Sequence, residues 1–435
     1  MSPPGNGRVP SHSAIAIVAA PLVLAVLVPS CTSEPERRDL PDVDLDLPSD
    51  AFTDAPSEGP APTIPSDVAT LPGRLAVLDV TGDLVAVDPD GSDEALLDDV
   101  EPGLSQVRQP SWSPDGSLAW VHLEATDEET VEVVIATSTG AGGRSTEAAT
   151  ATVPFYLSWD PTSSRIAYLG PSPDAEIELG ILEVAGDAPG TTLDAGRPFH
   201  LSWAPGGDQL LVHVGGDRLE RLGLDGSLTT VVEEPGAFTT PVWTADGRSF
   251  VYAAAGAQGH HLVVHDVEAE RGRPLVPFDG LVTFVVSPDG ERIAFQVLEE
   301  QRALPLTVID VGTGETVEIT DALTAGYFWS PDGERLLYLN PVPDEEAFWY
   351  RWGVWDGTSS FVTPRFVPSL LFVRDYMRFF EQYAQSLSLW SPDGTAFAYP
   401  GSSEDGEQGI WIQSARPDRA PVLVAEGAFV AWSPT

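Results

Sequence analysis

A five-residue phrase, Trp-Ser-Pro-Asp-Gly or a close variant of it, returns eight times along this chain of 435 residues. Successive copies are separated by 47, 44, 40, 43, 43, 61 and 42 residues. A repeat of about 40 to 45 residues that contains four short strands is typical of one blade of a β-propeller. The copies begin at Trp112, Trp159, Trp203, Trp243, Val286, Trp329, Trp390 and Trp432.

The residue types of the phrase have a mechanical reason. Pro presets φ for the first central position of a type I turn, Asp suits the second, and Gly follows where a positive φ is convenient. The large, flat Trp ahead of the turn can fill the wedge between neighbouring blades, contributing on the order of 5 kcal/mol as an upper bound. The phrase therefore predicts a tight turn between the innermost strand (strand a) and the next strand (strand b) of each blade.

The two ends of the repeat region complement each other. The segment 429–432 has the pattern of a strand a with nothing after it, and 73–78 has that of a strand b with nothing before it. Joined to strands at 84–87 and 95–97, they complete one blade and remove the exposed edges of an open ring. We expect an all-β, eight-bladed β-propeller over residues 71–435, with seven blades as the alternative if the second unit is misread.

The repeats resemble the WD40-like repeats of the TolB-type propeller family over about residues 71–435, on the Trp-Ser-Pro-Asp-Gly phrases given above. The resemblance implies the propeller architecture and no particular activity. The chain differs from TolB in lacking the α/β domain that precedes the propeller in that family, and in its apparent lipid anchor.

The 61-residue spacing contains about 18 extra residues, and a helical insertion is expected at about 368–386, before the last blade. Phe372, Tyr376, Phe379, Phe380 and Tyr383 form a stripe at helical spacing, and Pro368-Ser369 is a plausible start signal. The topology of a blade places this insertion on the face of the disc opposite the Trp-Ser-Pro-Asp-Gly turns.

The insertion and the neighbouring seventh blade supply the candidate partner-binding residues. Arginines beside aromatic rings, in a chain poor in cations, could attract an acidic glycan or a peptide carboxylate. The alternative is that the insertion caps the channel and its polar side is simply solvated. The candidate residues are Trp349, Trp352, Arg374, Tyr376 and Arg378.

The first 70 residues resemble the leader of a lipoprotein. Residues 1–30 contain an unbroken apolar run at 14–28, too short to span a bilayer comfortably but typical of a signal peptide. Val28-Pro-Ser-Cys31 resembles a bacterial lipobox, which makes Cys31 the expected site of lipid attachment; an ordinary signal peptide with an incidental thiol is the alternative. Residues 31–70, rich in Pro, Ser and acids, are expected to form a disordered tether. The protein would then be extracytoplasmic and anchored to the cell membrane.

Composition excludes several classes of function. The 22 basic residues are all arginine and face 66 acids, giving a net charge of −44, which is incompatible with nucleic-acid binding through phosphate neutralisation. Excess acid without lysine is the composition expected of a high-salt bacterium. A single cysteine permits no internal disulfide, and His260, His261 and His265 cannot converge from one strand on a metal ion. No Gly-x-Ser-x-Gly nucleophile elbow occurs.

These observations predict a monomeric, non-catalytic module without cofactor or metal, which binds or scaffolds a protein or polysaccharide of the cell envelope. The alternative is a channel-centred hydrolase or lyase of propeller type, which would need carboxylates or a metal around the axis. Several positions expected to line the channel are hydroxylic, which argues against that alternative: Thr239, Thr240, Thr283 and Ser386.

Overall fold

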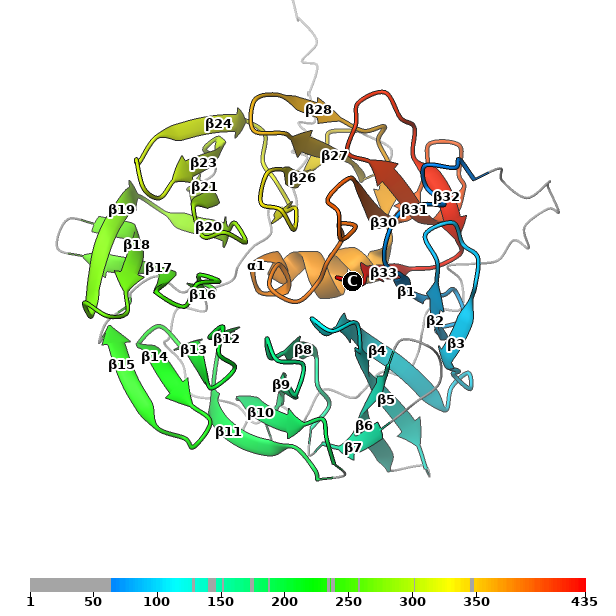
Figure 1. Ribbon diagram of the computed structural model, residues 1–435, viewed down its shortest axis with the longest axis horizontal. Helices are drawn as coiled ribbons and strands as arrows, with labels where there is room; N and C mark the ends of the chain where they lie inside the picture. Colours follow the sequence, from blue (N-terminus) through cyan, green and yellow to red (C-terminus); the bar gives the residue numbers. More distant parts are fainter. Residues whose placement is uncertain are drawn as a thin grey trace, which may run out of the picture. The chain divides into compact units, whose positions relative to one another are not determined.

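A computed structural model describes residues 64–435 except 127–129, 140–145, 151, 173–175, 187, 233–234, 236–238, 257–258, 301 and 345–347. In this part of the chain, eight antiparallel sheets form a ring around a central axis (Figure 1). Seven of the sheets have four strands and the sixth has five, because a two-residue strand is added to it. The structure confirms the expected eight-bladed, all-β propeller.

The first blade is shared between the two ends of the propeller, as the sequence predicts. It consists of β33 (Phe429–Trp432), β1 (Leu75–Leu78), β2 (Leu84–Val87) and β3 (Ala95–Asp98). β33 pairs with β1 in antiparallel register, with Trp432 opposite Leu75 and Phe429 opposite Leu78. All eight residues of these two strands are buried, so closure of the ring is a core interaction.

The other blades take their strands a to d in chain order. Blades 2 to 4 contain β4 (Ser105–Trp112), β5 (Leu118–Ala125), β6 (Val131–Ser138) and β7 (Thr146–Ala149); β8 (Tyr156–Trp159), β9 (Arg165–Pro171), β10 (Ile177–Glu183) and β11 (Thr191–Gly196); and β12 (Phe199–Trp203), β13 (Gln209–Val214), β14 (Arg218–Gly223) and β15 (Leu228–Val232). Blades 5 and 6 contain β16 (Val242–Trp243), β17 (Ser249–Gly256), β18 (Gly259–Asp266) and β19 (Arg271–Phe278); and β20 (Leu281–Val286), β21 (Arg292–Glu299), β22 (Arg302–Ala303), β23 (Leu306–Asp310) and β24 (Thr316–Thr320). Blades 7 and 8 contain β25 (Gly326–Trp329), β26 (Leu336–Val342), β27 (Trp349–Trp355) and β28 (Ser360–Val362); and β29 (Val367–Pro368), β30 (Ala396–Ser402), β31 (Gln408–Ser414) and β32 (Val422–Ala425).

The repeated tryptophans fill the seams between blades, as expected, and they also bond across them. The indole Nε1 of Trp203 donates to the carbonyl oxygen of Ser158, the residue that precedes the Trp of the previous blade. Trp112, Trp159, Trp329 and Trp390 donate to the equivalent carbonyl of their own preceding blades. The Trp243 indole N–H is buried without a hydrogen-bond partner among the described residues.

The Trp-Ser-Pro-Asp-Gly turns have the predicted geometry. The Gly116 N–H donates to the Ser113 carbonyl at 3.1 Å, and Gly116 has a φ of +85°. The Ser113 hydroxyl additionally donates to the Asp115 carboxylate, so the turn is closed by a side chain as well as by the backbone. These turns define one face of the disc, which we call the turn face. The opposite face, formed by the b–c and d–a connections, is called the insertion face.

The helical insertion comes before β30, β31 and β32 of the last blade, as expected, and only the two-residue strand β29 of that blade precedes it. β29 pairs with Gly401 and Ser402 at one end of β30, whereas the Leu389 carbonyl accepts from Ala398 and Trp390 bridges Phe397 near the other end. The innermost strand of this blade therefore begins at Val367, ahead of the insertion, and resumes near Leu389. Because strand a borders the axis, a segment that leaves it midway enters the channel.

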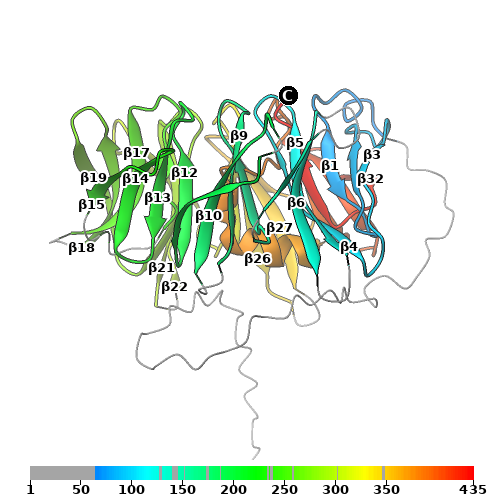
Figure 2. The ribbon, with the colours of Figure 1, turned by 90° about the horizontal axis from the view of Figure 1, so that it is seen from below.

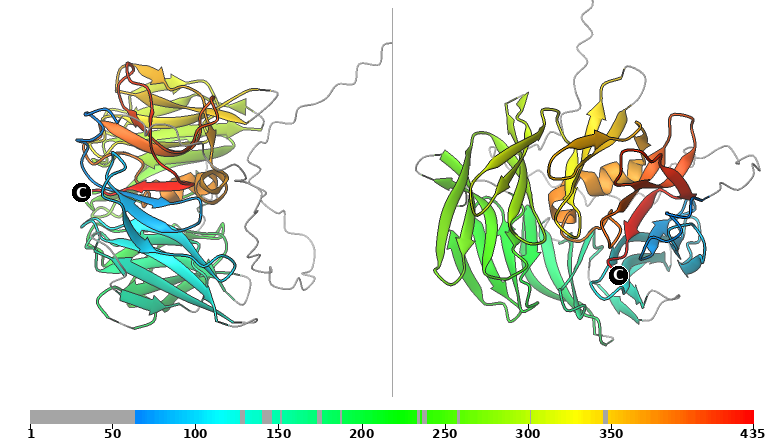
Figure 3. Two further views of the ribbon diagram at one scale, coloured as in Figure 1. Left: turned by 90° about the vertical axis from the view of Figure 1, so that its right-hand side faces the viewer. Right: turned by 45° about the horizontal axis from the view of Figure 1, so that its top comes forward.

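Three short helical pieces make up the insertion: a π-helix (Phe372–Tyr376), a 3-10 helix (Met377–Phe379) and α1 (Phe380–Tyr383). The Ser369 hydroxyl accepts from the Phe372 N–H at 3.2 Å, which supports the expected start signal. The insertion lies inside the ring, at the end opposite the C-terminus (Figures 2 and 3).

Both ends of the described chain lie at the turn face. Val68 and Leu71 pack against the core cluster shared by blades 1 and 8, and Asp67 forms an ion pair with Arg419 at 3.2 Å. Residues 64–70 of the expected tether are thus part of the folded unit. The expected signal peptide, Cys31 and the rest of the tether lie outside the described residues. No helix in the described ranges is long and apolar enough to cross a membrane.

Candidate binding face around the channel insertion

The insertion is held by the unpaired edges of the innermost strands. In a propeller, strand a has a neighbour on one side only, so its other edge presents free backbone groups to the axis. Gln382 pairs with such an edge: its Oε1 accepts from the Leu201 N–H at 2.9 Å, and its Nε2 donates to the Leu201 carbonyl at 2.8 Å. The same amide donates to the Tyr156 hydroxyl at 2.9 Å. One buried side chain therefore ties the insertion to blades 3 and 4.

Aromatic residues of the insertion pack against blades 1 to 3. The Tyr383 hydroxyl donates to the Gln109 Oε1 at 2.8 Å, and its ring meets that of Tyr156 edge-on, with centroids 5.1 Å apart. The Tyr376 ring stacks on Phe429 of the closing strand, at 4.3 Å. Burial raises the pKa of both tyrosines well above its ordinary value, so their hydroxyls act as neutral hydrogen-bonding groups.

The opposite side of the insertion packs against blades 6 and 7. The Phe380 ring lies 4.9 Å from that of Tyr327, and Gly326 leaves room for Met377, whose Cε would lie 2.3 Å from a Cβ at that position. The half-buried Glu381 carboxyl accepts from the Phe284 N–H at 2.9 Å. Burial raises the pKa of Glu381 to about 8, and this hydrogen bond opposes the shift. The carboxyl is thus mostly protonated at neutral pH.

Two histidines lie beside the insertion between blades 4 and 5. His200 and His213 pair across β12 and β13, and each bonds toward blade 5: His200 with the Thr240 hydroxyl at 3.1 Å, and His213 with the Thr239 carbonyl at 2.9 Å. Burial lowers the pKa of His200 to about 3 and that of His213 to about 4. Both rings are neutral at physiological pH. Within the described ranges, no three His, Cys, Asp or Glu side chains are grouped so that they could hold a metal ion.

The structure separates the five predicted partner-binding residues into two groups. Trp352 is fully buried among aromatic rings of blades 7 and 8, and Tyr376 is buried against Phe429. These two side chains support the core and are not accessible to a partner. Arg374 and Arg378 are exposed on the insertion, and Trp349 is half-buried at the insertion-face end of blade 7.

The helical stripe is shifted from the predicted one. Phe379 is 50% exposed, whereas Met377 and Gln382, which are outside the predicted stripe, are buried. A π-helical turn contains about one residue more than an α-helical turn, so it displaces every later side chain around the axis. The sequence patterns used above contain no signal for such a turn, which is why the roles of Glu381 and Gln382 were missed.

The exposed arginines differ in their partners. Arg374 forms a two-pronged ion pair with Asp375, at 2.6 and 2.9 Å, which raises the pKa of Arg374. The Arg378 guanidinium lies 5.5 Å from the centre of the Phe379 ring and has no carboxylate within 4 Å among the described residues. Burial lowers the pKa of Arg108 on β4; the nearby Arg374 charge lowers it further, whereas Asp375 opposes the shift. Arg108 and Arg374 thus share the neighbourhood of Asp375.

Exposed apolar side chains gather on the insertion face. Of the thirteen large hydrophobic residues that are exposed in the described ranges, nine lie in connections or strand ends of this face or on the insertion. They are Val80, Leu104, Val131, Phe155, Leu281, Leu323, Phe348, Leu370 and Phe379. The other four lie on outermost strands, and one of them, Leu228, is at the turn-face end of its strand. On blade 7, the Arg365 guanidinium lies 4.6 Å from the centre of the Trp349 ring.

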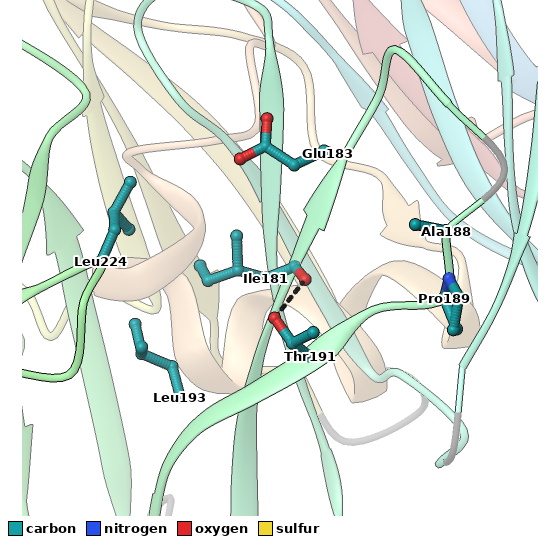
Figure 4. A pocket seen from close by; sticks show the side chains of 7 residues that line it. All are labelled: Ile181, Glu183, Ala188, Pro189, Thr191, Leu193 and Leu224. Carbon is teal, nitrogen blue, oxygen red and sulfur yellow. Dashed lines mark hydrogen bonds between the residues drawn. The ribbon is translucent and has the colours of Figure 1, made fainter.

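A small pocket of about 170 Å³ lies among the outer strands of blades 3 and 4, away from the innermost strands (Figure 4). Its lining is mainly aliphatic, and its Thr191 hydroxyl donates to the Ile181 carbonyl at 3.5 Å. The lining residues are Ile181, Glu183, Ala188, Pro189, Thr191, Leu193 and Leu224.

Comparison with known proteins supports the fold. No protein-family model matches the chain, and no curated protein sequence matches it. Among solved structures, the chain is similar to a eukaryotic initiation factor (11% identity, 83% of this chain and 98% of that one, TM-score 0.50). It is also similar to TolB from Acinetobacter baumannii (17% identity, 76% and 82%, TM-score 0.40) and to an oligogalacturonate lyase in complex with manganese (13% identity, 72% and 86%, TM-score 0.47). TolB is thus among the propellers that this chain resembles, as expected, and the likeness is one of fold.

Proposed function

We propose that this protein is a non-catalytic binding or scaffolding module. A lipid on Cys31 would anchor it to the outer surface of the cell membrane. Its insertion face would bind a protein or polysaccharide of the cell envelope. The observation that carries the proposal is that nine of the thirteen exposed large apolar side chains of the described ranges, and an arginine stacked on an aromatic ring, lie on this one face. Exposed apolar surface and arginine beside aromatic rings are features of interaction surfaces.

The arrangement in the channel favours binding over catalysis. The Gln382 amide bonds to Leu201 and Tyr156, and the Glu381 carboxyl bonds to the Phe284 backbone. The polar groups that reach the axis from the insertion are therefore engaged in holding it. In a channel-centred hydrolase or lyase, such groups would have to converge on a substrate.

The anchoring half of the proposal is tested with Cys31→Ala in the full-length chain. Lipid chains contribute about 0.8 kcal/mol per buried methylene, so the wild type should stay in the membrane fraction after an alkaline carbonate wash. The variant should move to the soluble fraction and lose the incorporation of labelled fatty acid. Retention of the variant in washed membranes would refute the lipid anchor.

The binding half is tested by pull-down from envelope extract with the Arg374→Ala/Arg378→Ala double variant. We expect at least a tenfold loss of the retained material, measured by quantitative mass spectrometry and by sugar analysis. Arg248→Ala is the matched control, because this arginine is 86% exposed but lies at a turn of the turn face. Equal retention by all three proteins would contradict the assignment of the insertion face.

A further inference from the structure

The chemistry of the insertion face distinguishes between kinds of partner, if the proposed function holds. Sugars are held by flat aromatic rings and by hydrogen-bonding side chains, and aliphatic groups offer neither. Six of the nine exposed apolar residues on this face are valine or leucine, and among them Leu370 is 69% exposed. Such side chains gain from contact with another apolar surface. The face is therefore suited to a protein.

The charges at the insertion specify the partner further. Asp375 pairs with Arg374 and lies near Arg108, whereas Arg378 has no carboxylate within 4 Å among the described residues; the chain as a whole carries a net charge of −44. An acidic side chain placed here would meet guanidinium groups that can bind a carboxylate bidentately. The Arg378–Phe379 stack presents a cation and an apolar ring side by side. A carboxylate next to an apolar side chain would complement both.

Two other occupants fit less well. A second copy of this chain would bring another net charge of −44 against this one, which opposes association. A bilayer surface with anionic headgroups would be repelled for the same reason. Both ends of the described chain lie at the turn face, so the insertion face is not covered by Ile64–Leu71 or by Thr435.

We infer that the insertion face docks an envelope protein that presents an apolar patch with an acidic residue, seated over Arg374, Arg378 and Phe379. The ring of Phe348 on blade 7, which is 73% exposed, lies on the same face of the disc. This inference rests on the proposed function and narrows it from any envelope component to a protein.

The test is site-specific photocrosslinking in native membranes with the full-length, lipidated chain. The photoreactive residue p-benzoyl-phenylalanine replaces Phe379 or Phe348, and in a matched control it replaces Leu228, which is 49% exposed near the turn face. We expect one discrete protein adduct from the two insertion-face positions, at least tenfold stronger than from position 228. The crosslinked partner peptide, mapped by mass spectrometry, should contain or adjoin Asp or Glu.

A charge reversal completes the test. Adding Arg374→Glu/Arg378→Glu to the Phe379 photoprobe should weaken the adduct at least tenfold, with an unchanged melting curve because both arginines are exposed. Equal adducts from Leu228 and Phe379, or an adduct that is insensitive to charge reversal, would overturn the inference. A polydisperse glycan adduct would overturn it while leaving the proposed function intact. Absence of any adduct, together with equal retention in the pull-down above, would overturn both.

Discussion

The Gln382 amide meets the Leu201 backbone as a neighbouring strand would, accepting from its N–H and donating to its carbonyl. Glu381 does half of this at Phe284, where its carboxyl accepts from the backbone N–H. These adjacent side chains bond to innermost strands of different blades, β12 of blade 4 and β20 of blade 6. Part of the free strand edge at the centre of the ring is thus satisfied by side chains.

The titration of Glu381 predicts a pH dependence of stability. Its pKa is about 8 in the folded protein, above the ordinary value of 4.5. The folded state therefore binds the extra proton between these values, and stability falls as pH rises from about 5 to about 9. Glu381→Gln keeps the acceptor for Phe284 and removes the charge. At pH 9 we expect this variant to be more stable than the wild type by on the order of 1–3 kcal/mol.

The comparison is made by urea unfolding at pH 5 and pH 9. Near pH 5 the two proteins should be almost equally stable, because Glu381 is then protonated in the folded state. Glu268→Gln, at an exposed position between β18 and β19, controls for the general effect of removing an acid. If the Glu381 variant gained no stability over this control at pH 9, the carboxyl would not be buried in its protonated form.

At the scale of elements, Trp203 and Trp243 form a natural comparison. Both are 8% exposed and begin equivalent turns, but Trp203 donates its indole N–H to Ser158 and Trp243 has no acceptor among the described residues. Replacement by phenylalanine removes similar volume at both sites. We expect Trp203→Phe to destabilise the protein more than Trp243→Phe, by about 1 kcal/mol, the net value of one hydrogen bond.

Denaturant melts of the two variants measure this difference directly. The acceptor for Trp203 is the backbone carbonyl of Ser158, so the two tryptophan variants can be compared without any change at Ser158. Equal losses of stability would mean that the tryptophans act through packing alone. A larger loss at Trp243 would reverse the order expected from the bonding pattern.

The insertion shows which part of an element can be predicted from residues. Its position before the final turn, its aromatic character and its face of the disc followed from spacing and topology. Its entry midway along strand a did not, because Val367 and Pro368 carry no pattern that separates a two-residue strand from a loop. Which residues of the insertion are exposed was only partly predictable, because the π-helical turn moves Phe379 outward and Gln382 inward.

Closure of the whole ring depends on the four residues of β33. Phe429, Val430 and Trp432 have no exposed surface, and β33 is the only innermost strand that β1 has. A chain ending at Ala428 should lose on the order of 5 kcal/mol or more of stability, from this apolar burial alone. The measurement is the calorimetric melting temperature, with a chain ending at Ser433 as the control, because it retains β33 entire. A melt unchanged by the longer truncation would exclude closure through this strand.

The global fold was predictable because its information is repeated. Nearly every blade has its own Trp, turn Gly and alternating strand. A copy that departs from the pattern, such as the one beginning at Val286, can therefore still be recognised from its spacing to the other copies. The proposed partner surface has no such repetition. It is assembled once, from blades 2, 7 and 8, and distances between those blades are set by the closed ring and not by any local pattern.

Because the insertion interrupts strand a of blade 8, the segment proposed to bind the partner is continuous with a strand that builds the propeller. A ligand that binds only the folded propeller, with the insertion in the channel, would raise the free energy of unfolding by RT ln(1 + [L]/Kd). This amounts to about 2.7 kcal/mol at a ligand concentration one hundred times Kd. The melting temperature would then measure how much of the protein is bound, without any label. Conversely, a change that opens the ring would lower the affinity for the partner.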